Sequence, residues 1–235
     1  PVSLTSAGRV YFKGCQELVA RNEAIEQQVR MIDNELSGVV RVFAMYSTGI
    51  GWMTQVQSGF AEQCPEAQVQ LHYDRPDVIH QAVIEGRCDI GLVSFPEHRD
   101  SVGSWGLRDE PMAMVCPPQH PLAREHEPGD LSKLDGQRMA GITLDLPMGR
   151  RTAIAIKNAG GEPIVIDHFD NIDTLKAAVI EANCLAILPA RTVRREVTAG
   201  VLAALEITPG LSRPFGEIYD KSIGLSPVAI AFATE

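Results

Sequence analysis

The sequence contains none of the short motifs that mark common catalytic or nucleotide-binding sites. A Gly-x-Ser-x-Gly turn, a phosphate-binding Walker loop and a His-Glu-x-x-His helix are all absent. Gly49 and Gly51 lack the third glycine of a dinucleotide-binding turn, and the six histidines have no zinc-ligand spacing. We therefore expect no catalytic residue, no metal site and no cofactor.

Membrane and secretion signals are also missing. No run approaches the roughly 18 consecutive apolar residues of a membrane span, and no basic, apolar leader opens the sequence. The five cysteines are odd in number and widely spaced, which is atypical of a disulfide framework. Reduced thiols in the cytoplasm are the expectation, with no membrane contact.

An excess of positive charge is lacking too. The 235 residues carry 21 Lys and Arg against 30 Asp and Glu, a net charge of −9. This balance is unfavourable for a surface that binds DNA phosphates. The chain opens at Pro1 without an initiator Met, which suggests the interior of a longer protein. Any DNA-contacting surface is expected outside this chain.

The first 37 residues show two apolar series with heptad spacing. The first series is Leu4, Tyr11, Leu18, Ile25 and Ile32, and the second is Gly8, Cys15, Asn22, Val29 and Leu36. Such a seam predicts one long helix, with Thr5 as its N-cap and Gly38 just beyond its C-terminus. We expect it to form a dimer through Leu18, Asn22, Ile25, Val29 and Ile32. The alternative is an amphipathic helix that packs on its own domain.

From residue 38 onward, short apolar runs alternate with helical periods in two successive sets. This alternation predicts an α/β fold of two subdomains with mainly parallel sheets and a cleft between them. We expect subdomain I to contain residues 38–116 and 208–235, because the last strand and helix lack partners in the second set. Subdomain II is then residues 117–207.

Small polar residues follow several of the predicted strands or precede predicted helices. They are Ser47, Thr48, Ser94, Thr143 and Asn171. Hydroxyl and amide groups beside the N–H groups of a helix N-terminus can hold an anion, although each residue alone could be an ordinary N-cap. Taken together, they predict a site for a small anionic effector, a carboxylate or a phosphate.

Several segments resemble the LysR-type transcriptional regulators, in an order and spacing typical of that family. They are Leu4-Thr5-Ser6-Ala7-Gly8, Gly38-Val39-Val40-Arg41-Val42, Phe60-Ala61-Glu62-Gln63-Cys64-Pro65, Glu85-Gly86-Arg87-Cys88-Asp89-Ile90-Gly91, His120-Pro121-Leu122, Leu185-Ala186-Ile187-Leu188-Pro189 and Leu225-Ser226-Pro227-Val228-Ala229. One departure is Asn183-Cys184, where the family usually has a glycine.

The resemblance implies two Rossmann-like subdomains in a periplasmic-binding-protein type 2 arrangement, preceded by a long linker helix. Residues 1–37 would contain the end of a winged helix-turn-helix and the linker helix. It further implies dimers and often tetramers, an effector held between the lobes, and promoter DNA bound only by a preceding region. The family's peroxide sensors use a cysteine pair in the second lobe; here that lobe has Cys184, with Cys116 at its border, so redox sensing is not expected.

Two other functions share a two-lobed cleft. A transporter's solute-binding protein would need export, and the N-terminal helix would have no purpose in it. A bilobal small-molecule enzyme would need converging acid, base or nucleophile groups, for which Asp145, His168 and Asp170 are the nearest candidates. We expect a regulator rather than an enzyme.

Overall fold

The computed structural model describes residues 4–32, 36–48, 50–96, 101–125 and 127–234. The chain forms two compact units, of which unit 1 contains residues 1–107 and 215–235 and unit 2 contains residues 108–214. Two long strands, β4 (Val102–Cys116) and β9 (Ser212–Asp220), carry the chain from one unit to the other. The α/β class is confirmed, whereas the boundaries expected at residues 116/117 and 207/208 stay a prediction.

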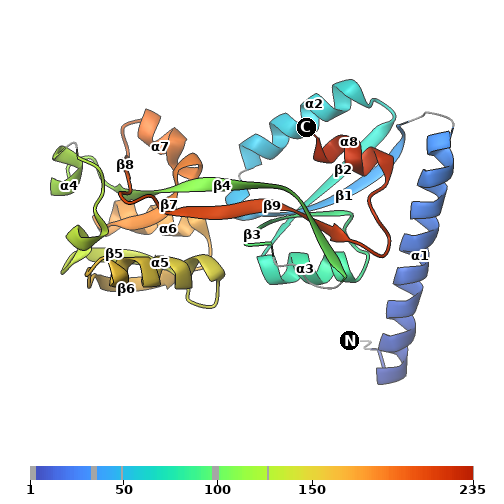
Figure 1. Cartoon of the computed structure of the whole chain (residues 1–235), viewed down its shortest axis with the longest axis horizontal. Helices are drawn as coiled ribbons and strands as arrows, with labels where there is room; N and C mark the ends of the chain where they lie inside the picture. Colours follow the sequence, from blue (N-terminus) through green and yellow to red (C-terminus); the bar gives the residue numbers. More distant parts are fainter. Residues whose placement is uncertain (1–3, 33–35, 49, 97–100, 126, 235) are drawn as a thin grey trace. The chain divides into compact units, whose positions relative to one another are not determined.

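The N-terminal helix α1 spans Ser6–Ile32 and belongs to unit 1 (Figure 1). Thr5 caps it, because its Oγ1 accepts the Gly8 N–H at 3.0 Å. The prediction for Gly38 is wrong: it begins strand β1 with φ 115°, and its N–H donates to the Glu66 carbonyl at 3.3 Å. The sheet, rather than the helix, therefore determines the conformation of Gly38.

Unit 1 is built on three parallel strands in the order β2-β1-β3, with β9 antiparallel to β3. The strands are β1 (Gly38–Met45), β2 (Ala67–Asp74) and β3 (Ile90–Ser94). The short helix η1 (Tyr46–Thr48) and α2 (Ile50–Gln63) follow β1, and α3 (Pro76–Ile84) follows β2. Helix α8 (Pro227–Ala233) returns to this unit from the far end of the chain.

Helices cover both faces of the unit 1 sheet, with α2 and α8 on one side and α3 on the other (Figure 1). Val40 and Val42 of β1 are fully buried, as alternation along a covered strand requires. Phe60 of α2 and Phe232 of α8 meet edge to face with ring centroids 5.4 Å apart. The C-terminal segment is therefore part of the core of unit 1.

Unit 2 contains a second set of parallel strands. Strand β5 (Arg138–Ile142) pairs in parallel with β6 (Ile164–Phe169) and, through a bridge to Leu185, with the segment that enters β7 (Ala186–Pro189). β4 pairs antiparallel with both β7 and β8 (Ala203–Glu206), so the expectation of mainly parallel pairing fails for these strands.

The helices of unit 2 connect these strands. They are α4 (Pro121–Arg124), η2 (Leu131–Leu134), α5 (Pro147–Asn158), α6 (Ile172–Glu181), η3 (Ala190–Val193) and α7 (Arg194–Thr198). Leu175 and Val179 of α6 are buried against Ala186 and Leu188 of β7 in one apolar cluster. This cluster fixes α6, and with it the turn that leads from β6 into α6.

Candidate functional site

The three polar residues predicted in unit 1 lie at the carboxyl ends of adjacent parallel strands. Ala44 of β1 is paired with Leu92 of β3, so the register sets Tyr46 level with Ser94. Ser47 and Thr48 follow in η1, where Thr48 is fully buried, and Ser94 ends β3 at 8% exposure. The carboxyl edge of parallel strands is where ligands bind in open α/β sheets.

The backbone N–H and the side-chain O–H of Ser94 both donate hydrogen bonds to one sulfur atom. The backbone N lies 3.3 Å and the Oγ 3.6 Å from Sδ of Met45, the last residue of β1. The next residue, Phe95, has φ 52°, a left-handed conformation that is uncommon for a bulky side chain. Backbone strain of this kind is concentrated at functional sites, where the surrounding structure maintains it.

The two polar residues predicted in unit 2 also lie at a carboxyl edge. Thr143 follows β5, and its N–H donates to the carbonyl of Phe169, the last residue of β6, at 2.9 Å. Asn171 comes two residues after β6 and precedes α6. Thr143 and Asn171 are therefore on neighbouring strand ends of one sheet.

Helix α5 begins at this edge without a side-chain cap. Its N-cap residue is Leu146, which makes no side-chain hydrogen bond to the first turn. A Cβ on Gly149 would meet the Thr143 and Ile142 carbonyl oxygens, the latter at 2.7 Å, so glycine lets α5 approach β5 closely. The N–H groups of the first turn of α5 thus lie beside Thr143.

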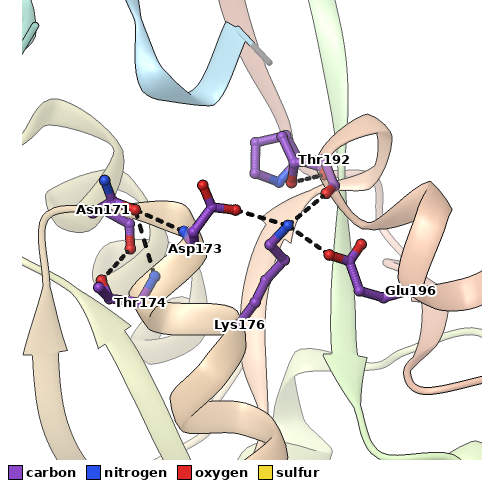
Figure 2. Close-up of polar contacts among 7 residues, drawn as sticks. Asn171, Asp173, Thr174, Lys176, Thr192 and Glu196 are labelled. Carbon is purple, nitrogen blue, oxygen red and sulfur yellow. Dashed lines mark hydrogen bonds and ion pairs between the residues drawn. The ribbon is translucent and has the colours of Figure 1, made fainter. Parts of the chain in front are cut away.

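Asn171 caps the N-terminus of α6 (Figure 2). Its Oδ1 accepts the N–H groups of Asp173 at 2.8 Å and Thr174 at 3.4 Å, and its carbonyl accepts the Thr174 hydroxyl at 2.9 Å. This is the N-cap arrangement that the sequence allowed as an alternative. The Oδ1 of Asn171 therefore serves the helix.

Lys176 ties α6 to the turn that follows β7 (Figure 2). Its Nζ lies 2.9 Å from Asp173, 2.7 Å from Glu196 of α7 and 3.4 Å from the carbonyl oxygen of Thr192 in η3. Burial by itself would lower the pKa of Lys176, but the bonds to Glu196 and Asp173 outweigh it and raise that pKa. A charged Lys176 therefore anchors η3 to α6.

A cluster of three charged residues, which the sequence analysis did not find, lies in unit 2. The carboxylate of Glu110, in β4, accepts hydrogen bonds from Nε and Nη2 of Arg191 at 2.9 and 2.7 Å. It also accepts one from Nε of Arg213 at 2.7 Å. Glu110 and Arg213 are buried, while the Arg191 side chain is 25% exposed. Burial favours a raised pKa for Glu110, but both guanidinium groups outweigh it and lower that pKa.

Arg191 brings this cluster to the same edge of the unit 2 sheet. It is the second residue after β7, and η3 carries it. The bridge between Met139 and Leu185 sets Thr143 level with Pro189, two residues before Arg191. No local motif identifies the cluster, because Glu110 and Arg213 are 103 positions apart in the sequence.

The predicted dimerisation residues lie along α1. Leu18, Ile25 and Val29 are 72%, 46% and 56% exposed. Asn22 is also exposed and donates from Nδ2 to Glu26 at 2.8 Å. The backbone of Ile32 ends α1, but its side chain lies outside the described residues. Within the chain itself, the side chains of Leu18, Ile25 and Val29 are therefore about half or more exposed to solvent.

The described residues contain neither a metal-binding cluster nor a membrane-spanning helix. Among residues 4–32, 36–48, 50–96, 101–125 and 127–234, no group of three or more His, Cys, Asp or Glu is arranged to hold a metal ion. In the same part of the chain, no helix combines the length and apolar character needed to cross a bilayer.

The cysteines offer no reactive pair in unit 2. Cys116 and Cys184 are both free and buried. Burial raises the pKa of Cys116 to about 11 and also raises the pKa of Cys184. Thiols with raised pKa values are poor nucleophiles near neutral pH; the absence of redox sensing stays a prediction.

The family model of the LysR substrate binding domain matches residues 33–235. A curated relative, the SDS degradation transcriptional activation protein of Pseudomonas sp. (strain ATCC 19151), is 30% identical over 98% of this chain and 76% of its own length. A second relative, the RuBisCO operon transcriptional regulator of Acidithiobacillus ferrooxidans, is 23% identical over 98% of this chain and 74% of its own length.

Among solved structures, the effector binding domain of QuiR in complex with shikimate has a TM-score of 0.72 and 14% identity. It covers 83% of this chain and 93% of its own. At that identity the likeness establishes the fold alone, and it confirms the periplasmic-binding-protein-like arrangement of two Rossmann-like subdomains.

Proposed function

This chain belongs to the LysR-type transcriptional regulators as their effector-binding part, and from that membership we propose that it binds a small carboxylate or phosphate metabolite. The relatives are transcriptional regulators, so the enzyme and solute-binding alternatives are set aside. The effector changes how the regulator is arranged on promoter DNA, which a region preceding this chain would contact. Acting on DNA, the regulator would work in the cytoplasm.

One observation carries the choice of an anion: in each unit, small polar donors gather at the carboxyl edge of parallel strands. In unit 1 these donors are Ser47, Thr48 and Ser94, and in unit 2 they are Thr143 and Asn171. The uncapped first turn of α5 adds backbone N–H groups beside Thr143. Such groups suit a carboxylate or phosphate because the helix dipole and the N–H groups favour negative charge.

Any contact of Asn171 with the effector must leave its N-cap of α6 intact. Its Oδ1 is engaged with α6, so it would contact an effector through the side-chain amide N–H groups. The solved complex of QuiR with shikimate, a carboxylate, supports the same class of ligand.

Native mass spectrometry of the purified chain tests the proposal first, by showing whether a metabolite copurifies unchanged. Calorimetry with that metabolite then compares wild type with Thr48→Ala and Thr143→Ala, each expected to weaken binding by about 1–3 kcal/mol. Thr198→Ala is the matched control, since Thr198 is exposed at the end of α7. Wild-type affinity in both variants, or an uncharged apolar metabolite, would reject the assignment.

We also propose that α1 pairs with α1 of a second copy, forming a dimer that can associate further into a tetramer. The support is the exposure of Leu18, Ile25 and Val29 on one helix. Burial of each such side chain contributes roughly 1.5–3 kcal/mol. Asn22 would restrict the register at a cost in stability, as a polar seam residue does in coiled coils.

Sedimentation of the double variant Leu18→Asp with Ile25→Asp should give monomers at micromolar concentration. The control carries Val197→Asp with Val201→Asp, two residues of unit 2 that are 40% and 44% exposed. It should sediment like wild type. Dimers of unchanged strength in the α1 variant would contradict the proposed pairing.

A further inference from the structure

We propose that Met45 is a specificity-determining residue of the effector site: its thioether holds the donors of Ser94 until an oxygen of the bound anion replaces it. This inference rests on the proposed function, because it assumes that Ser94 contacts an anionic effector. It adds a residue and a physical reason for selecting anions.

Two donor groups of Ser94 share one acceptor, the sulfur of Met45. Sδ of Met45 lies 3.3 Å from the backbone N and 3.6 Å from Oγ of Ser94. Met45 is 4% exposed and Ser94 8% exposed, so water has little access to either residue. Both residues end neighbouring parallel strands of unit 1, β1 and β3.

The sulfur is the weak member of this arrangement. A thioether is a weak hydrogen-bond acceptor, whereas an ionised carboxylate or phosphate oxygen makes bonds about twice as strong as neutral ones. Methionine is unbranched and has three rotatable side-chain bonds, so Met45 can leave Ser94 without moving β1. Exchange of sulfur for oxygen therefore favours an anion, and an apolar ligand gains nothing from it.

A purely structural role for Met45 makes a different prediction. Met45 belongs to the apolar core of unit 1, and packing alone would make any substitution there neutral or harmful to binding. The exchange mechanism instead predicts opposite signs for two replacements. Leucine cannot accept a hydrogen bond, so no acceptor at residue 45 competes with the anion for the donors of Ser94. Glutamine offers a stronger acceptor of similar length, which competes with the anion.

The experiment titrates inorganic phosphate into the 235-residue chain and follows the backbone amide resonance of Ser94 by NMR. Met45→Leu should bind phosphate about three- to tenfold more tightly than wild type, and Met45→Gln about three- to tenfold more weakly. Met53→Leu is the matched control, since Met53 is fully buried in the same apolar core, and its affinity should not change. Circular dichroism reports whether each variant folds.

The outcomes separate this inference from the proposed function. If both Met45 variants shift the affinity in the same direction, or neither does, the role of Met45 is overturned while phosphate binding at Ser94 stands. If phosphate leaves the Ser94 resonance unmoved in every protein, the inference is overturned, but a copurified metabolite would still uphold the proposed function. Should Met45→Gln fail to fold, unchanged or weaker binding by Met45→Leu alone overturns it.

Discussion

Replacing Glu110 by Gln should be the most damaging single polar substitution in unit 2. The side chain accepts bonds from two guanidinium groups, and the Arg213 Nη2 is only 2.6 Å from its Oε2. Glutamine keeps the shape of the side chain but removes its negative charge. Two like charges would then face each other in a site where Arg213 is 3% exposed.

The size of the loss follows from burial. Removing one partner of a buried ion pair costs about 3–5 kcal/mol, because the other charge stays desolvated and uncompensated. Arg191 is one quarter exposed, so water screens part of its charge, whereas Arg213 has almost no access to water. Most of the expected loss therefore comes from Arg213.

Urea unfolding followed by circular dichroism measures this loss. Glu85→Gln provides the control, because Glu85 pairs with Arg87 at 2.8 Å but both side chains reach solvent, and such pairs are worth about 0–1 kcal/mol. A second variant, Glu110→Leu with Arg213→Met, should be more stable than Glu110→Gln because it removes the buried charge with its partner. If Glu110→Gln loses no more than the Glu85 control, the electrostatic reasoning is wrong.

Four further expectations concern other parts of the chain. Because folding lowers the pKa of Glu110, its contribution to stability is complete above the ordinary Glu pKa and is lost as the pH falls through the lowered pKa of the folded state. Stability measured against pH should therefore fall more steeply in acid for wild type than for Glu110→Gln. Gly149→Ala should destabilise unit 2 by about 1–3 kcal/mol, since its Cβ would meet backbone oxygens, and calorimetric melting would reveal it. Lys176→Met should speed amide hydrogen exchange in η3, with Lys157→Met, at the C-terminal end of α5, as the unchanged control. An aromatic disulfide reagent should modify the half-buried Cys15 before the four buried cysteines, which should react only after denaturation; equally fast reaction of all five would contradict the burial.

Local sequence patterns predicted the elements of this fold well because they report on local physics. Helix α1 could be predicted from the spacing of apolar residues within its own sequence. Its N-cap could be predicted because Thr5 bonds to Gly8, only three residues away. Strand β1 is recognisable from its mostly apolar residues, of which Val40, Val42 and Ala44 are fully buried. Gly38 was misplaced because its conformation depends on Glu66, a residue far along the chain.

The candidate site was only partly predictable, for the same reason. Ser47 and Ser94 could be placed at strand ends because the order of strand and helix is local information. The partner of Ser94 could not be predicted, since Met45 has the sequence character of a core residue and its sulfur meets Ser94 only through the pairing of β1 with β3. The Glu110 cluster likewise exists only once β4, β7 and β9 are assembled.

The polar residues near the carboxyl edges of the two units are held with different strength, and this difference bears on regulation. In unit 2, Lys176 fixes Thr192 and Glu110 fixes Arg191, so two adjacent residues of η3 are bound by charged groups. In unit 1, the N–H and O–H groups of Ser94 donate to a thioether, which is a weak acceptor. A ligand shifts a conformational equilibrium only by its different affinity for the two states. An anion that replaces Met45 changes the partners of Ser94, whereas η3 keeps its own; the energetic response to the effector should therefore originate in unit 1, at the end of β3.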